Sequence, residues 1–251
     1  MISKIIENKR KEIEISKKEL PLPSFKDKLK NAKRDFKKAL SKNKLNLIAE
    51  IKRKSPSKNM VSKEFKIKEI VKIYNKYADA ISVLTDKKFF DGSLMDLKTI
   101  SKLSKLPVLR KDFIIDEYQI YESRLYNADA ILLIESILSD KELNHFIGVA
   151  ENYGMSCLIE IHTEEELNKA LNSNATIIGI NNRNLNTLEV DTGTTLKLAD
   201  KIPKGKIIVS ESGISSKEYV KKIAGKVNAM LVGTLFMNSE KVEEEILSLM
   251  K

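Results

Sequence analysis

From Leu45 onward the sequence alternates between short apolar runs and longer amphipathic segments, with eight of each. A short apolar run suits a buried strand, and apolar residues repeating every three or four positions suit a helix. The apolar runs span residues 46–52, 80–85, 107–111, 130–135, 156–161, 176–181, 206–210 and 228–233, and the helical segments span residues 67–77, 94–103, 117–126, 140–153, 164–171, 194–199, 216–223 and 240–249. Strands that alternate with helices pair in parallel. The α/β pattern of residues 45–251 therefore predicts a single closed (β/α)8 barrel.

A doubly wound open sheet is the alternative fold for such a pattern. That fold usually carries a glycine-rich turn after its first strand. Here the corresponding residues are Arg53, Lys54, Ser55, Pro56 and Ser57. The missing glycines favour the barrel.

Residues 1–44 differ from the rest of the chain because they are highly charged. Apolar residues at helical spacing (Ile2, Ile5, Ile6 and Ile13) are followed by a Leu-Pro-Leu-Pro break and a second helical run over residues 25–40. We expect an N-terminal extension of two helices that caps the barrel. The simplest interpretation of its charged faces is solvated surface, and a short helix can also cover an active site.

The composition narrows the class of protein. Of 251 residues 42% are hydrophobic, no run is long enough to span a membrane, and the lone Cys157 excludes an intramolecular disulfide. We expect a soluble, monomeric protein of a reducing cytoplasm, without a membrane partner. Cys157 has the strand parity of an outward residue, so we expect it to pack beneath a helix.

The net charge of +10 suits an anionic partner, either nucleic acid or a phosphorylated metabolite. The lysines are scattered, aromatic residues make up only 6% of the chain, and tryptophan is absent, so no stacking platform for single strands is evident. We expect no nucleic-acid partner beyond weak nonspecific association. With His145, His162 and Cys157 as the only soft ligands, no metal cluster is expected.

Polar residues stand at the carboxyl ends of the predicted strands, where barrels place their active sites. In the first strand Glu50 and Lys52 share a face with Ile48, because strand side chains alternate. An edge strand with a solvated face is the blander interpretation. Further strand ends carry polar groups on the same face as an apolar residue: Lys111, Glu160, Asn181 with Arg183 just beyond it, and Glu211. The set predicts an active site at this end.

Two other stretches suit a phosphate group. Ser212-Gly213 follows the seventh strand and Gly233-Thr234 follows the eighth. Small residues there let backbone N–H groups approach an anion, and this is the usual phosphate position of such barrels.

Several runs together resemble one enzyme family: IAEIKRKSPS, LTDKKFFDGS, VLRKDF, LIEI, IGINNRNL, VSESGI and VGTLFM, in this order over almost the whole chain. In order and spacing they resemble the indole-3-glycerol-phosphate synthases. The opening ISKIIENKRKEIE is similar to the N-terminal helix with which that family helps to cover its substrate, although the tryptophan that some members place there is absent.

The resemblance implies a lyase of tryptophan biosynthesis. It would convert 1-(2-carboxyphenylamino)-1-deoxyribulose 5-phosphate to indole-3-glycerol phosphate, carbon dioxide and water, with no cofactor or metal. Lys111 resembles the family's general acid in ring closure, Glu160 the carboxyl group of the acid–base steps, and Lys52 a substrate-contacting acid or base. Glu50, Asn181, Glu211 and Ser212 match the remaining catalytic and binding positions.

Substrate contacts are expected from six residues: Ser55, Pro56, Phe90, Phe113, Leu132 and Arg183. Phe89 is a further candidate for the aryl pocket. Lys52, Ser212, Gly213, Gly233 and Thr234 are the expected phosphate ligands, and residues 54–64 are expected to form a lid over bound ligand.

The chemistry requires a proton for the substrate's carbonyl oxygen. A desolvated lysine beside other cations has a lowered pKa, which is the state expected for Lys111. For Glu160, desolvation and neighbouring lysines act in opposite directions, and the sequence leaves the outcome open. A phosphoribosyl isomerase is the rival phosphate-binding barrel, and a basic nucleic-acid-binding module is the rival from another class.

Overall fold

The computed structural model describes residues 1–54 and 66–250. In these residues eight parallel strands close into a barrel in sequence order, with β8 paired to β1. The strands are β1 Asn46–Ile51, β2 Ala80–Leu84, β3 Val108–Lys111, β4 Ala130–Ile134, β5 Ser156–Ile161, β6 Ile177–Asn181, β7 Ile207–Glu211 and β8 Ala229–Val232. The predicted barrel is confirmed, and the open doubly wound sheet is wrong.

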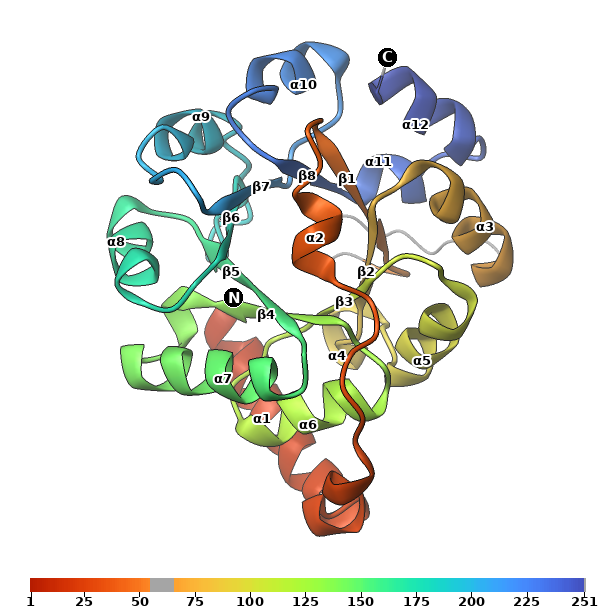
Figure 1. Cartoon of the computed structure of the whole chain (residues 1–251), viewed down its shortest axis with the longest axis vertical. Helices are drawn as coiled ribbons and strands as arrows, with labels where there is room; N and C mark the ends of the chain where they lie inside the picture. Colours follow the sequence, from red (N-terminus) through yellow and green to blue (C-terminus); the bar gives the residue numbers. More distant parts are fainter. Residues whose placement is uncertain (55–65, 251) are drawn as a thin grey trace.

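Helices surround this barrel on the outside, as Figure 1 shows. They are α3 Ile67–Tyr77, α4 Lys87–Phe90, α5 Leu94–Leu103, α6 Glu117–Leu125, α7 Asp140–Asn152, α8 Glu164–Asn172, α9 Gly193–Ala199, α10 Lys217–Ile223, α11 Thr234–Met237 and α12 Val242–Met250, with a 3-10 turn η3 at Glu135–Ile137. Side-chain caps define where several begin; α7, for example, has a capping box between Ser139 and Glu142. Among the described residues, no helix combines the length and apolarity needed to cross a bilayer.

Strand alternation separates two buried clusters, as the sequence pattern predicted. Ile48, Leu109, Leu158 and Val209 pack together inside the barrel. Residues of the opposite parity, including Cys157, pack between the barrel and the helices. Burial raises the pKa of the Cys157 thiol, so this cysteine is a packing residue rather than a reactive one.

The N-terminal segment departs from its prediction. α1 spans Ile2–Glu19 as expected, but residues 25–40 do not form one helix. Two 3-10 turns, η1 Leu22–Ser24 and η2 Lys26–Lys28, precede an extended stretch and the short helix α2 Phe36–Leu40. Phe25 is buried against Tyr118, with ring centroids 6.0 Å apart, so this apolar residue anchors a surface strap instead of continuing a helical face.

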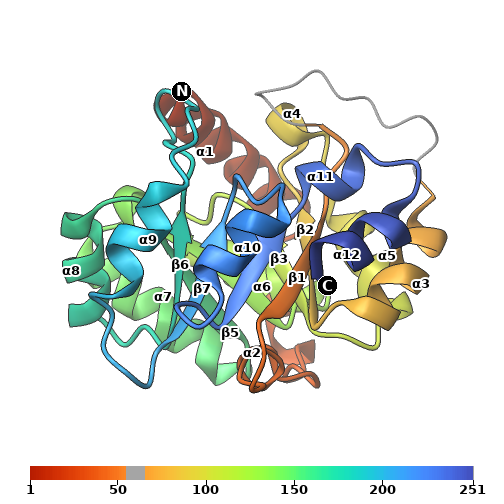
Figure 2. The same ribbon diagram turned by 90° about the horizontal axis from the view of Figure 1, so that it is seen from above.

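The two N-terminal helices lie at opposite ends of the barrel, which the side view of Figure 2 makes plain. α2 closes the amino end of the strands, where Phe36 and Leu40 are fully buried in the inner cluster. α1 lies at the carboxyl end, beside α4, and its Ile5 reaches the same inner cluster. The carboxyl end is therefore the end at which the polar strand termini face an N-terminal helix.

Candidate active site

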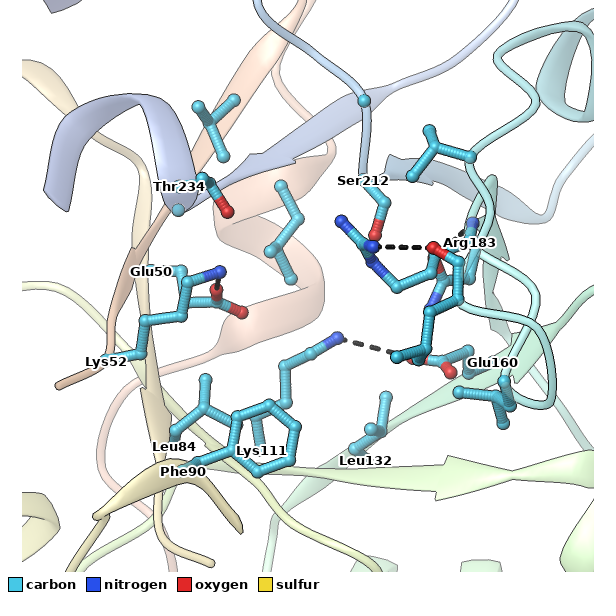
Figure 3. A pocket seen from close by; sticks show the side chains of 18 of the residues that line it. Glu50, Lys52, Leu84, Phe90, Lys111, Leu132, Glu160, Arg183, Ser212 and Thr234 are labelled. Atoms are coloured by element: carbon cyan, nitrogen blue, oxygen red, sulfur yellow. Dashed lines mark hydrogen bonds and ion pairs between the residues drawn. The ribbon is translucent and has the colours of Figure 1, made fainter. Parts of the chain in front are cut away.

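A cavity of about 720 Å³ opens at the carboxyl ends of the strands. Its walls include, among others, these residues expected at the site: Glu50, Lys52, Phe90, Lys111, Phe113, Leu132, Glu160, Asn181, Arg183, Ser212, Gly213, Gly233 and Thr234. Figure 3 shows Ser212 and Thr234 toward one end, Phe90, Leu84 and Leu132 toward the other, and the charged groups between them. The cavity thus has a polar end, an apolar end and a charged middle.

Lys111 lies at the centre of the charged part of the cavity, where it contacts two carboxylates. Its Nζ lies 2.6 Å from Oε2 of Glu211 and 3.3 Å from Oε2 of Glu160. Both carboxylates are buried, and no more than 1% of the Glu211 side chain is exposed. At the end of β1, Nζ of Lys52 lies 2.7 Å from Oε1 of Glu50.

These neighbours overturn the expected protonation state of Lys111. Burial lowers the pKa of Lys111, but the carboxylates of Glu211, Glu160 and Glu50 outweigh burial and raise that pKa above its usual value. The expected lowering of this pKa required neighbouring cations, whereas the barrel surrounds the Lys111 ammonium with carboxylates. Lys111 is therefore protonated at neutral pH and has a proton to give.

The carboxyl groups around Lys111 differ from one another. Burial raises the pKa of Glu160, yet Lys111 and His162 more than compensate and hold that pKa below its usual range. Burial also raises the pKa of Glu211, and despite Lys111 it stays raised, at about 7. One carboxylate is thus firmly ionised while the other titrates near neutrality, which is how a site separates acid and base roles.

The polar end of the cavity is built from two turns. Ser212 and Gly213 both have left-handed backbone conformations, with φ of 64° and 74°. A Cβ on Gly213 would lie 2.7 Å from Cγ1 of Val190, so glycine is required here for space as well as for conformation. Asn182 fixes the turn by donating from Nδ2 to the carbonyl oxygen of Ser212, 2.9 Å away.

The apolar end carries the expected aromatic pair. The rings of Phe90 and Phe113 lie 6.2 Å apart, and Leu132 lines the same wall. Phe89 packs against the inner cluster but is not among the described residues that line the cavity. Ile2 and Ile5 of α1 complete the lining, so aliphatic side chains occupy the N-terminal helix's share of the pocket.

Comparison with known proteins identifies this arrangement. The family described as indole-3-glycerol phosphate synthase matches residues 2–249. The chain belongs to this family. A synthase from Endomicrobium trichonymphae is 53% identical over 213 residues, covering 84% of this chain and 83% of the relative. One from Caldanaerobacter subterraneus subsp. tengcongensis is 51% identical over 208 residues, covering 82% and 81%.

A longer relative also matches almost the whole chain. The tryptophan biosynthesis protein TrpCF of Buchnera aphidicola subsp. Acyrthosiphon pisum is 42% identical over 248 residues, 99% of this chain but 55% of that protein. Indole-3-glycerol phosphate synthase is a decarboxylating lyase of tryptophan biosynthesis, and that is the function of this chain. Family membership decides against the phosphoribosyl isomerase as the main activity.

The remaining sequence expectations for the synthase site have mixed outcomes. Arg183 lines the cavity, and its Nη1 donates to the carbonyl oxygen of Leu188, 2.8 Å away. Ser55, Pro56 and nearly all of the expected lid, residues 54–64, lie outside the described residues. Within the described part of the chain, no group of three or more His, Cys, Asp or Glu side chains is arranged to hold a metal ion.

Sequence reasoning missed the reason for two glycines of the synthase site. A Cβ on Gly233 would collide with the Glu50 carboxylate, and a Cβ on Gly179 would collide with Oε1 of Glu211. The space beside Gly233 is therefore filled by the Glu50 carboxylate. Alternation already put Gly179 on the inner face, but only the closed barrel places Glu211 against it.

We predict that Gly179→Ala lowers kcat on the order of 10²-fold, because the new methyl group pushes the Glu211 carboxylate away from Lys111. Steady-state kinetics and thermal melting of the same preparation would measure the two effects separately. Gly148→Ala is the matched control, since a Cβ there meets nothing within 4 Å. A Gly179→Ala enzyme with the parent kcat would contradict this account.

Proposed function

We propose that Lys111 is the general acid of ring closure, Glu160 the general base of the later steps, and Lys52 the second cation at the reacting carbons. The observation that carries this proposal is the position of the Lys111 ammonium, 2.6 Å and 3.3 Å from two buried carboxylates in the middle of the cavity. Such a group is charged, desolvated and fixed in place before substrate arrives.

Ring closure joins the ring carbon that bears the carboxylate to the ketone carbon of the sugar. As that bond forms, the carbonyl π electrons move to oxygen, which takes a proton from the Lys111 ammonium. The carboxylate then leaves as carbon dioxide, and its bonding electrons restore the aromatic ring. The recovered aromaticity drives decarboxylation, so the protein mainly has to orient this carboxylate, and the Lys52 cation is suited to do so.

Dehydration completes the indole. The hydroxyl group accepts a proton and leaves as water, and we assign Lys52 as the donor of that proton. The neighbouring carbon loses a proton to Glu160. Glu160 suits this role because the cations around it keep it ionised. The protons balance, since each group that gives or accepts one is restored by solvent after product leaves.

The two ends of the cavity orient the substrate in this proposal. The phosphate lies at the Ser212-Gly213 and Gly233-Thr234 turns, and the aryl group lies against Phe90, Phe113 and Leu132. Incubating the pure protein with 1-(2-carboxyphenylamino)-1-deoxyribulose 5-phosphate and following indole absorbance tests the reaction directly. Absence of indole formation by folded protein would refute it.

For the phosphate end, we predict that Ser212→Ala and Thr234→Ala each weaken product binding by about 1 kcal/mol, the usual net value of one hydrogen bond. Backbone N–H groups remain in both variants, so the loss stays small. Gly213→Ala should weaken binding more, because the turn needs a left-handed backbone and has no room for Cβ. Calorimetric titration with indole-3-glycerol phosphate measures the affinity of all three variants. If each variant bound the product as tightly as the parent protein does, the phosphate would lie elsewhere.

We also propose that α1 covers the aryl end of the cavity and that Lys9 fixes it there. The side chain of Lys9 is 4% exposed, and its Nζ lies 2.8 Å from Oδ2 of Asp86 and 2.9 Å from Oδ1 of Asp112. Burial lowers the pKa of Lys9, but these two aspartates outweigh burial and raise the pKa above its usual value, so the ammonium stays charged. Asp112 directly follows Lys111, which ties the helix to the catalytic strand.

Lys9→Met is expected to destabilise the protein by about 3 kcal/mol, because it leaves Asp86 and Asp112 buried without this cation. It should also raise KM more than it lowers kcat, since Ile2 and Ile5 lose their fixed position. Urea unfolding and steady-state kinetics measure the two effects. Lys11→Met, at a side chain that is 71% exposed, is the control; a Lys9→Met enzyme with the parent stability and KM would refute the anchoring role.

A further inference from the structure

His162 lies directly beside the proposed catalytic groups, although no step of the proposed reaction uses it. It follows the end of β5 and stands two residues beyond Glu160, so both side chains emerge on the same face of the strand. The same spacing relates Glu50 to Lys52 and Asn181 to Arg183. The His162 side chain is only 10% exposed.

The imidazole ring of His162 stands between two carboxylates. Its Nδ1 lies 3.0 Å from Oε2 of Glu166, and its Nε2 lies 3.3 Å from Oε1 of Glu160. An ionised carboxylate only accepts hydrogen bonds, so a ring facing one at each nitrogen is favoured with a proton on both. The geometry thus indicates an imidazolium. At 3.3 Å the contact with Glu160 is mainly electrostatic, whereas the shorter contact with Glu166 orients the ring.

Glu166 clamps this histidine at two points. Besides Nδ1, the backbone N–H of His162 donates to Oε2 of Glu166 across 2.6 Å. Glu166 lies in the first turn of α8, whose cap Thr163 accepts from the Glu166 backbone N–H. The start of α8 therefore fixes the ring relative to β5.

Glu160 in turn has a different cation at each carboxylate oxygen. Oε2 faces Lys111 of β3 and Oε1 faces His162, while Asn181 of β6 also bonds to this carboxyl group. Glu50 of β1 and Glu211 of β7 also act electrostatically on Glu160. Glu135 of η3, which is paired with Lys169 of α8, acts on Glu166. Burial lowers the pKa of His162, but Glu160 and Glu166 together raise it to about 10.

We propose that His162 and Glu166 are positioning residues for the reaction, holding the Glu160 carboxylate opposite Lys111 through a charged imidazole ring. This inference rests on the role proposed for Glu160. Its consequence is specific to the order of proton transfers. Once Lys111 has given its proton to the carbonyl oxygen, His162 still faces Glu160 as a cation, so Glu160 stays ionised until it accepts the proton released in dehydration.

The ring's charge can be tested without turnover, because the chain has only two histidines. Proton NMR titration of the ring resonances, assigned with His145→Gln, should show His162 protonated at neutral pH. In Glu166→Gln and in Glu160→Gln its pKa should fall by about one unit or more, as expected on losing a neighbouring charge. The His145 resonance should not move, since its partner is Glu117.

Kinetics then test the positioning role. His162→Asn should lower kcat about 10-fold with little change in KM, the scale expected on losing an orienting partner. The acidic limb of its kcat/KM profile should move to higher pH by about one unit, because Glu160 has lost a cation. Glu166→Gln should shift the same limb by less, which guards against a His162 variant that misfolds.

The outcomes separate this inference from the function on which it rests. A parent His162 that titrates near the free value of about 6.5 would overturn the charged ring. An unshifted acidic limb in folded His162→Asn would overturn the positioning role while leaving Glu160 as the base. Full turnover by Glu160→Gln would instead overturn the role of Glu160.

Discussion

Replacing Lys111 with methionine is expected to lower kcat on the order of 10² to 10⁴-fold, the usual contribution of a general acid. Methionine retains most of the lysine stem but has no proton to give. The loss should appear in kcat rather than KM, because Ser212, Thr234 and the aromatic wall still bind substrate. Steady-state kinetics with the aryl-amino-deoxyribulose phosphate measures both constants.

The same variant should acquire a distinctive pH dependence of stability. Glu211 already has a pKa of about 7 in the folded protein, above its ordinary 4.5, and without Lys111 that pKa rises further. A raised carboxyl pKa means that the folded state holds its proton more tightly than the unfolded state. The resulting stability is fully present below pH 4.5 and is lost as pH rises through the folded pKa.

Thermal melting from pH 5 to pH 8 should therefore show a steeper fall in melting temperature for Lys111→Met than for the parent. Lys102→Met, at an exposed position of α5, controls for loss of one positive charge. If Lys111→Met is folded and keeps a kcat within tenfold of the parent, Lys111 is not the general acid.

Glu160→Gln is expected to lower kcat by a comparable factor, again on the order of 10² to 10⁴-fold. Glutamine has the same shape and remains able to bond with Asn181, but it does not take up a proton at neutral pH. The substitution also removes one of the two carboxylates that contact Nζ of Lys111, so the Lys111 ammonium should be less firmly fixed in position in the variant. We expect a modest change in KM, because the phosphate and aryl ends are untouched.

The matched control is Glu165→Gln, an exposed glutamate in the first turn of α8. Circular dichroism should show the same fold for both variants. A synthase whose kcat survives Glu160→Gln but not Lys111→Met would require a different base, and the half-titrated Glu211 would be the next candidate.

Local periodicity made much of this fold predictable. The inner position of Ile48, Leu109, Leu158 and Val209 followed from alternation along each strand, a property of the backbone that needs no knowledge of neighbours. Periodicity gave a wrong prediction for residues 25–40, where apolar residues at helical spacing do not form one helical face. They pack against different parts of the barrel. Phe25 packs on Tyr118, and Phe36 packs in the inner cluster at the barrel's amino end. In both cases the contacting residues lie far away in sequence.

The site divides in the same way. Which polar residues reach the carboxyl end of the barrel was readable from strand parity, and the same parity rule also applies to His162. The charge states of these polar residues were not readable from the sequence, because the groups that set their pKa values come together only when the barrel closes. Lys111 is separated by 49 residues from Glu160 and by 100 from Glu211.

By itself, then, the sequence determined the barrel, its inner and outer faces, the family and the set of polar strand ends, all of which follow from short-range patterns. The tertiary structure alone decided that Lys111 stays protonated, that Gly179 and Gly233 make room for carboxylates, and that Lys9 of α1 contacts Asp86 and Asp112. Electrostatic energies and steric exclusion depend on distances through space, and closure of the barrel sets those distances between residues on different strands.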